Sequence, residues 1–213
     1  MEDLIDELAA DAGPVRPLAP PLRRALTTLG LAVMGGAAAV FLFGDVGQLF
    51  ERYAGREALM AIEMAAMLAT GLLAVTGAFF VSVPGGSKRW LLAPLPPFLA
   101  WLLLSGFGCY RELIRSGAAG WEIGHSMDCL LFILATSILL GAPLVWRLSR
   151  AAPIEPLRVA SLGGLGIAAI SAFLLQFFHP FAITFIDLAI HLIAILIVVA
   201  ATSLLNRHTL RPA

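Results

Sequence analysis

Six long apolar segments constrain this sequence more than any other feature. They cover residues 25–43, 58–83, 90–107, 127–146, 159–178 and 182–205. The hydrocarbon core of a bilayer is about 30 Å thick, and about 20 apolar residues cross it as a helix. Each segment is close to that length, and charged residues or prolines and glycines separate one from the next. The sequence therefore predicts an all-α, polytopic membrane protein with six transmembrane helices in one bundle.

Composition excludes a soluble globular enzyme. Of the 213 residues, 60% are hydrophobic and 13% are charged, against about 25% charged residues in soluble domains. Fourteen basic and fourteen acidic residues give no net charge, so we expect no direct nucleic-acid partner. Ser126 and His191 are a poor match to an intramembrane serine protease, because no oxyanion-hole element can be named. We assign no catalytic residue and do not expect an enzyme.

The distribution of basic residues predicts the orientation of the spans. The N-terminal segment, the second and fourth loops and the C-terminus together carry 10 Lys and Arg residues, whereas the other loops carry 4. Because cytoplasmic loops are enriched in Lys and Arg, both termini are expected in the cytoplasm. The first 24 residues hold no apolar stretch typical of a cleavable signal peptide. The chain then divides into a cytoplasmic segment 1–24, a membrane domain 25–205 and a cytoplasmic tail 206–213.

The start of the N-terminal segment has the pattern of a short amphipathic helix. Leu4, Ile5 and Leu8 recur at helical spacing and form an apolar stripe. Acidic residues surround this stripe, namely Asp3, Asp6, Glu7 and Asp11. Such a helix can place its stripe in a groove of a partner protein. The alternative is a solvated helical tail without a partner.

Ionisable and thiol side chains gather toward the opposite, periplasmic face. The candidate sensor residues are Glu63, Cys109, Cys129, His179, Asp187 and His191. Ionisable groups inside a membrane are costly, so each is a functional hypothesis. Asp187 and His191 are four residues apart and share a helix face, where the carboxylate can accept a hydrogen bond from the imidazole. The alternative is a buried pair that only fixes helix packing.

The two cysteines leave three alternatives open. Together with His179 and His191 they offer ligands suited to zinc or copper, with Asp187 supporting His191. No two of these ligands have a short spacing, so we expect no cofactor beyond this weak metal alternative. A disulfide between Cys109 and Cys129 would be worth about 3 kcal/mol. Two thiols that serve only in packing are the third alternative.

Small residues recur inside two of the spans, as in Gly35, Gly36 and Ala39 or Gly163, Gly164 and Ala168. This spacing allows helices to approach closely in lipid. Packing within the bundle is favoured over a dedicated dimerisation face. The oligomeric state is not determined by the sequence.

Several motifs resemble a known family. They are residues 4–22, LIDELAADAGPVRPLAPPL, followed by Arg23-Arg24; Ser82-Val-Pro-Gly85 with Lys88-Arg89-Trp90; Gly108-Cys109; Gly124-His-Ser126 with Cys129; Ala152-Pro153; and the final apolar helix with its basic tail. In this order they resemble the NrsF (negative regulator of sigma F) family of bacterial membrane anti-sigma factors. The resemblance covers essentially the whole chain.

The resemblance implies an inner-membrane protein that sequesters an ECF-type sigma factor and releases it in a stress response. Many members have a Cys-Pro where this chain has His179-Pro180, so Cys129 matches the family's thiol positions best. We therefore expect the N-terminal segment to bind the sigma factor and the sensor residues to receive an envelope-side metal or oxidative signal. The competing interpretation is a small membrane transporter or metal-handling protein that uses Glu63, Asp187 and His191.

Overall fold

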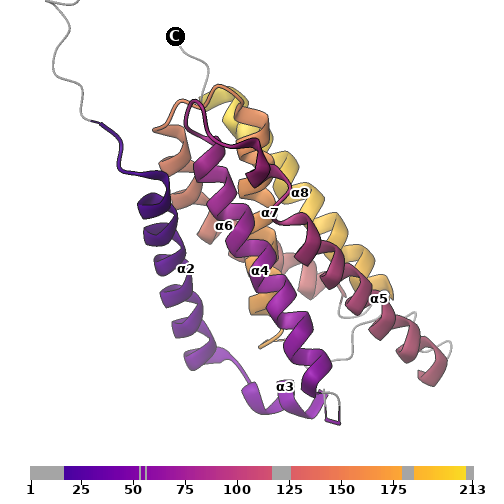
Figure 1. The fold of residues 1–213 in the computed structure, drawn as a ribbon. Helices are drawn as coiled ribbons and strands as arrows, with labels where there is room; N and C mark the ends of the chain where they lie inside the picture. Colours follow the sequence, from indigo (N-terminus) through magenta and orange to yellow (C-terminus); the bar gives the residue numbers. More distant parts are fainter. Residues whose placement is uncertain (1–16, 53, 56, 117–125, 179–184, 210–213) are drawn as a thin grey trace, which may run out of the picture.

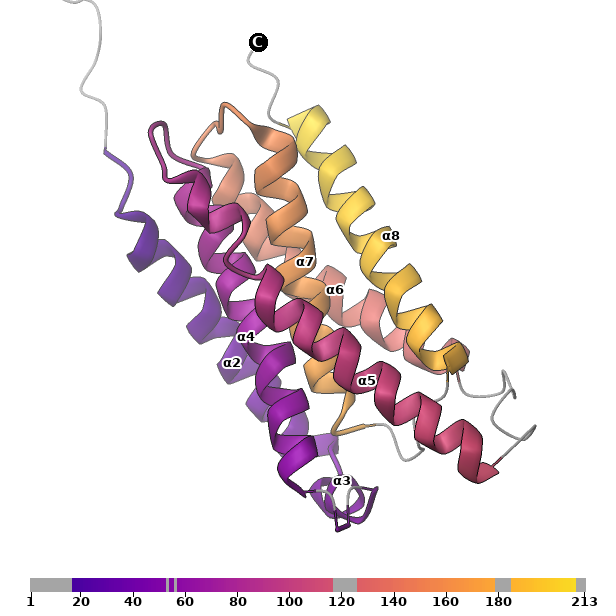
Figure 2. The same cartoon turned by 45° about the vertical axis from the view of Figure 1, so that its right-hand side comes forward.

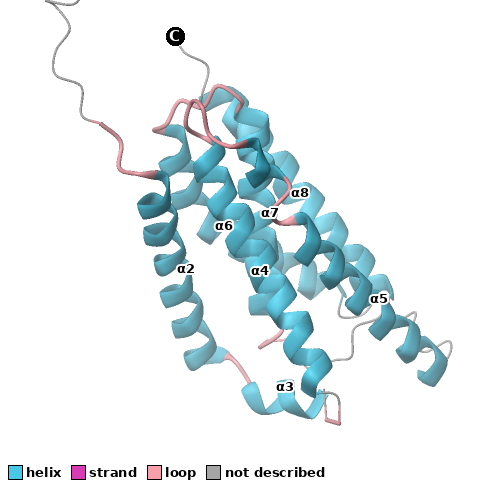
Figure 3. Ribbon diagram, in the orientation of Figure 1, coloured by secondary structure: helices cyan, strands magenta, loops and turns pink. Residues whose placement is uncertain are grey.

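The computed structural model describes residues 17–52, 54–55, 57–116, 126–178 and 185–209. These residues form seven α-helices and one short 3₁₀ helix, with no strand among them (Figure 3). The elements are α2 (Pro21–Phe43), α3 (Val46–Arg52), α4 (Glu57–Val81), η1 (Lys88–Leu91), α5 (Leu95–Ser116), α6 (Ser126–Ser149), α7 (Pro156–Leu175) and α8 (Phe185–Thr209). The predicted all-α class is confirmed. The predicted N-terminal amphipathic helix lies outside the described residues.

Six of these helical segments are long and apolar enough to cross a membrane. They are Pro21–Phe43, Glu57–Val81, Lys88–Arg111, Met127–Ser149, Pro156–Leu175 and Phe185–Leu204. The six predicted spans are confirmed to within a few residues. The third span agrees least closely: the sequence predicts its end near Phe107, the apolar helical segment ends at Arg111, and α5 itself continues to Ser116. The polar residues that follow Cys109 end the apolar run, but they do not end the helix. Cys109 therefore lies inside α5 and not at its end.

Prolines mark where several helices begin. α2 starts at Pro21 and α7 starts at Pro156. Pro96 and Pro97 lie in the first turn of α5. A proline in the first turn has a backbone angle suited to the helix, and the amide it lacks would have no intrahelical acceptor there. These prolines therefore position the helix starts without weakening the spans.

α7 is the central helix of the bundle and packs against α4, α6 and α8. Its small residues allow this close packing. A Cβ atom at Gly166 would lie 2.6 Å from Val75 Cγ2 and 2.9 Å from the Val75 backbone nitrogen on α4. A Cβ atom at Gly164 would lie 2.8 Å from Val199 Cα on α8. The close approach at Gly164 confirms the predicted use of small residues for packing within the bundle, and Gly166 is a further position that was not named in advance.

α2 lies at the edge of the bundle, where it contacts α4 and, less extensively, α6 (Figures 1 and 2). Many of its large apolar side chains are exposed, including Leu22, Val33, Met34 and Phe41. In a membrane-spanning helix such side chains face lipid. Gly36 is the point at which α2 meets α7, since a Cβ atom there would lie 2.9 Å from Leu174 Cδ2.

The two ends of the bundle differ in charge. α2 and α7 begin, and α4, α6 and α8 end, at the same end of the bundle (Figure 1). We call this the basic end, because its described residues include Arg23, Arg24, Lys88, Arg89, Arg147, Arg150 and Arg158. α3 and the starts of α4, α6 and α8 lie at the opposite end (Figure 1). Asp45, Glu51, Glu57, Asp128 and Asp187 lie at or near that opposite end.

Candidate functional site

Glu63 on α4 is held inside the bundle by a residue of the neighbouring helix. Its side chain is only 5% exposed. Ser105 Oγ on α5 donates a hydrogen bond of 2.5 Å to Glu63 Oε1. A hydrogen bond to a charged group in a low-dielectric interior is stronger than one between neutral groups. Glu63 is therefore a positioned, buried acid and not a lipid-exposed side chain.

Cys109 lies on the same side of α5 as Ser105, because the two residues are four apart in a helix. The thiol is buried, with 1% of the residue exposed. Both Glu63 and Asp187 are close enough to Cys109 to interact with it electrostatically. α5 packs against α4, which carries Glu63, and beside α8, which carries Asp187 (Figure 2), and this brings the three groups together.

Asp187 and His191 are both buried on α8, as predicted from their spacing. The predicted acceptor was wrong, however. His191 Nδ1 lies 2.6 Å from the backbone carbonyl oxygen of Asp187, so the bond goes to the main chain. Because a carbonyl oxygen only accepts, Nδ1 carries the proton, and a neutral imidazole then has its lone pair on Nε2.

Cys129 on α6 is also buried, at 2% exposed, and it packs with Ile133, Leu175 and Ala194. Asp187 is close enough to interact with it electrostatically. Asp187 is thus a neighbour of both cysteines, since it also interacts with Cys109. We call the buried group formed by Glu63, Cys109, Cys129, Asp187 and His191 the acid–thiol cluster.

The acid–thiol cluster contains most of the sensor residues predicted from the sequence, but it is not an assembled metal site. Within the described ranges, no three His, Cys, Asp or Glu residues are grouped so that they could hold a metal ion. His179 lies outside the described residues, and metal binding remains a prediction. Both cysteines carry thiols, and no disulfide joins them. The disulfide alternative is therefore not the state seen here, whereas a role of the thiols only in packing stays a prediction.

The sequence does not predict Ser105 as a residue of this site. The only feature of the sequence that points to Ser105 is its position four residues before Cys109 in an apolar helix. A serine in such a helix more often donates its hydroxyl to a backbone carbonyl of the same helix. Polar pairs of this kind also join other helices: Ser137 and Ser171 lie 3.2 Å apart between α6 and α7. The proposed partner-binding residues, Asp3 to Asp11, lie outside the described residues.

A comparison with protein families identifies the chain. The family described as NrsF, negative regulator of sigma F, matches residues 8–211. The chain belongs to the NrsF family. The similarity covers all six membrane-spanning helices and both cysteines. It also includes Leu8 and Asp11 of the predicted N-terminal helix.

One curated protein shows similarity over a shorter region. The lipoprotein signal peptidase of Syntrophomonas wolfei is 30% identical over 103 residues, which cover 48% of this NrsF-family chain and 66% of the peptidase. The chain thus spans less than two thirds of that relative. No solved structure matches this chain.

The acid–thiol cluster of this NrsF-family chain is buried among the residues that the structure describes. A transport pathway through Glu63, Asp187 and His191 would require these groups to line a hydrated cavity. Their side chains are instead buried, and Glu63 is bonded to Ser105. The geometry therefore favours a role in which the cluster fixes or changes the packing of α4, α5, α6 and α8.

Proposed function

We propose that this chain is a membrane anti-sigma factor that sequesters an ECF-type sigma factor through its cytoplasmic N-terminal segment. The observation that carries the proposal is the family match over residues 8–211, because the family is named for negative regulation of a sigma factor. Six apolar helices support a multi-pass membrane protein. A regulator of this kind needs no catalytic residue.

The orientation follows from the basic end. Lys and Arg are enriched on the cytoplasmic side of membrane proteins, and this supports an orientation with both termini on the cytoplasmic side of a bacterial inner membrane. The N-terminal segment then continues directly into α2 from the compartment in which a sigma factor acts. The acid–thiol cluster lies toward the periplasmic side.

The acid–thiol cluster is the proposed sensor. Its residues come from α4, α5, α6 and α8 and are buried where these helices pack together. A chemical change at one thiol would therefore alter the packing of more than one helix. A stimulus can shift the balance between two arrangements only by its differential affinity for them. Oxidation of a thiol, or binding of a soft metal ion to Cys129 and His191, would favour one arrangement and release the sigma factor.

Co-purification tests the binding part of this proposal. The full chain and a chain lacking residues 1–15 are expressed with the cognate ECF-type sigma factor and purified in detergent. The full chain is expected to retain the sigma factor, and the shortened chain is expected to lose it while still entering the membrane. Equal retention by both chains would contradict the assignment of the N-terminal segment.

A further inference from the structure

Two arginines meet at the basic end, between α2 and α6. Arg24 is only 8% exposed and lies 5.0 Å from the centre of the Phe79 ring. Its Nη2 donates to the backbone oxygen of Arg147, whereas its Nη1 has no hydrogen-bond partner. Arg147 Nη1 donates to Thr27 Oγ1 at 2.6 Å and to Thr28 Oγ1 at 3.1 Å.

No carboxylate among the described residues offsets these two charges. The ion pair found at this end in the described part of the chain joins Arg158 to Glu155. The acceptors around Arg24 and Arg147 are hydroxyl and carbonyl oxygens, which carry no formal charge. Two like charges held side by side without a counter-charge attract an anion.

An apolar groove of about 250 Å³ leads away from Arg147 between α2 and α6. Its lining runs from Thr28 to Ala39 on α2 and from Arg147 back to Thr136 on α6. Each stretch is about 16 Å long at the rise of an α-helix. That length matches the hydrocarbon depth of a single leaflet, which is half of about 30 Å.

We propose that this groove binds an anionic phospholipid, with an acyl chain between α2 and α6 and the headgroup phosphate at Arg147. Guanidinium groups bind phosphate through paired N–H donors. Arg24 lies behind Arg147 and adds a second positive charge. The groove faces the bilayer, since the neighbouring side chains Leu31 and Leu139 are exposed. An anionic lipid therefore fits both features of the site, because its acyl chain suits the apolar groove and its phosphate suits the arginines.

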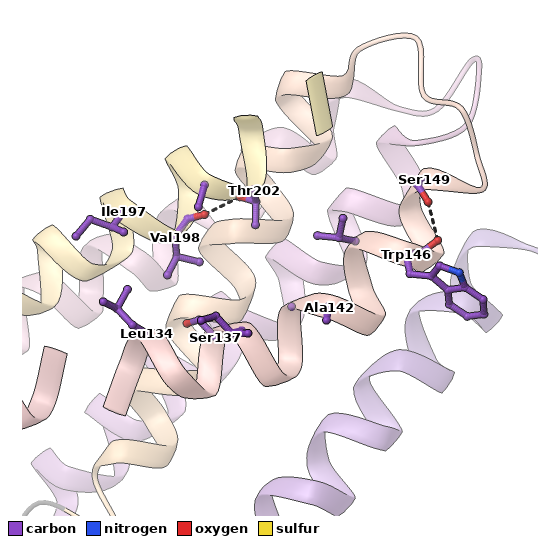
Figure 4. A pocket seen from close by; sticks show the side chains of 12 residues that line it. Leu134, Ser137, Ala142, Trp146, Ser149, Ile197, Val198 and Thr202 are labelled. Carbon is purple, nitrogen blue, oxygen red and sulfur yellow. Dashed lines mark hydrogen bonds between the residues drawn. The ribbon is translucent and has the colours of Figure 1, made fainter. Parts of the chain in front are cut away.

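A second groove, between α6 and α8, shows why charge is decisive. It is larger, at about 610 Å³, and it is also mainly apolar (Figure 4). Its hydroxyl groups already have partners in the protein: Thr202 Oγ1 donates to the Val198 carbonyl and Ser149 Oγ to the Trp146 carbonyl (Figure 4). The Ser137 hydroxyl pairs with that of Ser171 on α7. No charged residue lines this groove, so it offers a tail site without selectivity for an anionic headgroup.

Thermal unfolding of the purified full chain in detergent tests the proposal. Phosphatidylglycerol or phosphatidylcholine is added to the wild type and to three variants. Arg147→Gln removes the headgroup contact, and Gly35→Leu fills the groove at a position where a Cβ atom meets nothing within 4 Å. Arg158→Gln is the matched control, because this exposed arginine lies at the same end but outside the groove. Glycerol phosphate replaces the lipid in a further sample.

Phosphatidylglycerol is expected to raise the wild-type midpoint by at least about 3 °C over phosphatidylcholine. Arg147→Gln and Gly35→Leu should lose this difference, Arg158→Gln should keep it, and glycerol phosphate should have no effect. Equal shifts with both lipids would overturn the proposal. So would a retained shift in Arg147→Gln and Gly35→Leu, or a shift reproduced by glycerol phosphate. The proposal would also be overturned if phosphatidylglycerol stabilised only a chain that lacks residues 1–16. The acidic N-terminal segment, and not a lipid, would then be the partner of the two arginines in the full chain.

Discussion

The hydroxyl of Ser105 and the carboxylate of Glu63 are joined by a 2.5 Å hydrogen bond that connects α5 to α4. The loop between these two helices lies at the basic end, where Phe80 stacks on Trp90 with their ring centroids 4.6 Å apart. α4 and α5 thus form a helical hairpin, and Glu63 lies near the start of α4, away from this loop. The hairpin is therefore fixed near both ends, once by an aromatic contact and once by a polar one.

The first prediction concerns this polar contact. Ser105→Ala is expected to destabilise the chain by about 1 kcal/mol, because it leaves the Glu63 carboxylate without the serine donor. Unfolding in detergent measures the change. Ser161→Ala is the control, since Ser161 is exposed on α7, and it should change stability by less than about 0.5 kcal/mol. Equal effects of the two substitutions would contradict the role of the Glu63 contact.

The second prediction concerns the close approach of α4 and α7. Gly166→Ala is expected to destabilise the chain by about 1–3 kcal/mol, because the new methyl group meets the backbone of Val75 and forces the helices apart. Gly30→Ala on α2 serves as the control, since a Cβ atom there meets nothing within 4 Å. The same unfolding assay compares the two variants. A Gly166→Ala chain as stable as the Gly30→Ala chain would show that the packing is looser than described.

The sequence predicted the spans well because each must supply about 20 apolar residues, a local property of the chain. The short helix α3 was not predicted, since seven residues give too little periodicity. Which helices become neighbours depends on how their side chains pack, and the hydropathy of each segment does not determine this. Ser105 and Glu63 therefore could not be paired in advance. Arg24 was counted only as a flanking charge, although it is buried beside Arg147 and Phe79.

The third prediction concerns the thiols. Cys129→Ser is expected to hold sigma-dependent transcription permanently on or permanently off, because it changes a buried contact with Leu175 and Ala194. A transcriptional reporter in cells treated with oxidant or metal measures the response. Cys109→Ser should have the same effect only if the two thiols act together. A double Cys→Ser variant that responds normally would exclude the thiols and leave Asp187 and His191 as the candidates.

The fourth prediction concerns topology. A reporter fused after Ala213 is expected to be active in the cytoplasm, because the basic end carries most of the Lys and Arg residues that flank the spans. Paired reporters that are active on only one side of the membrane measure this. Activity restricted to the periplasm would invert the topology and would place the acid–thiol cluster toward the cytoplasm.

Binding of the purified sigma factor to single-residue variants of the full chain tests the central claim most directly. Leu8 belongs to the predicted apolar stripe, whereas the helical period predicts Ala10 on the opposite side of that predicted helix. Leu8→Asp is expected to raise the Kd by at least about tenfold, the loss expected for an apolar anchor of an interface. Ala10→Asp adds the same charge and should leave the Kd within about twofold. An unchanged Kd for Leu8→Asp, or an equal loss in both variants, would contradict the account.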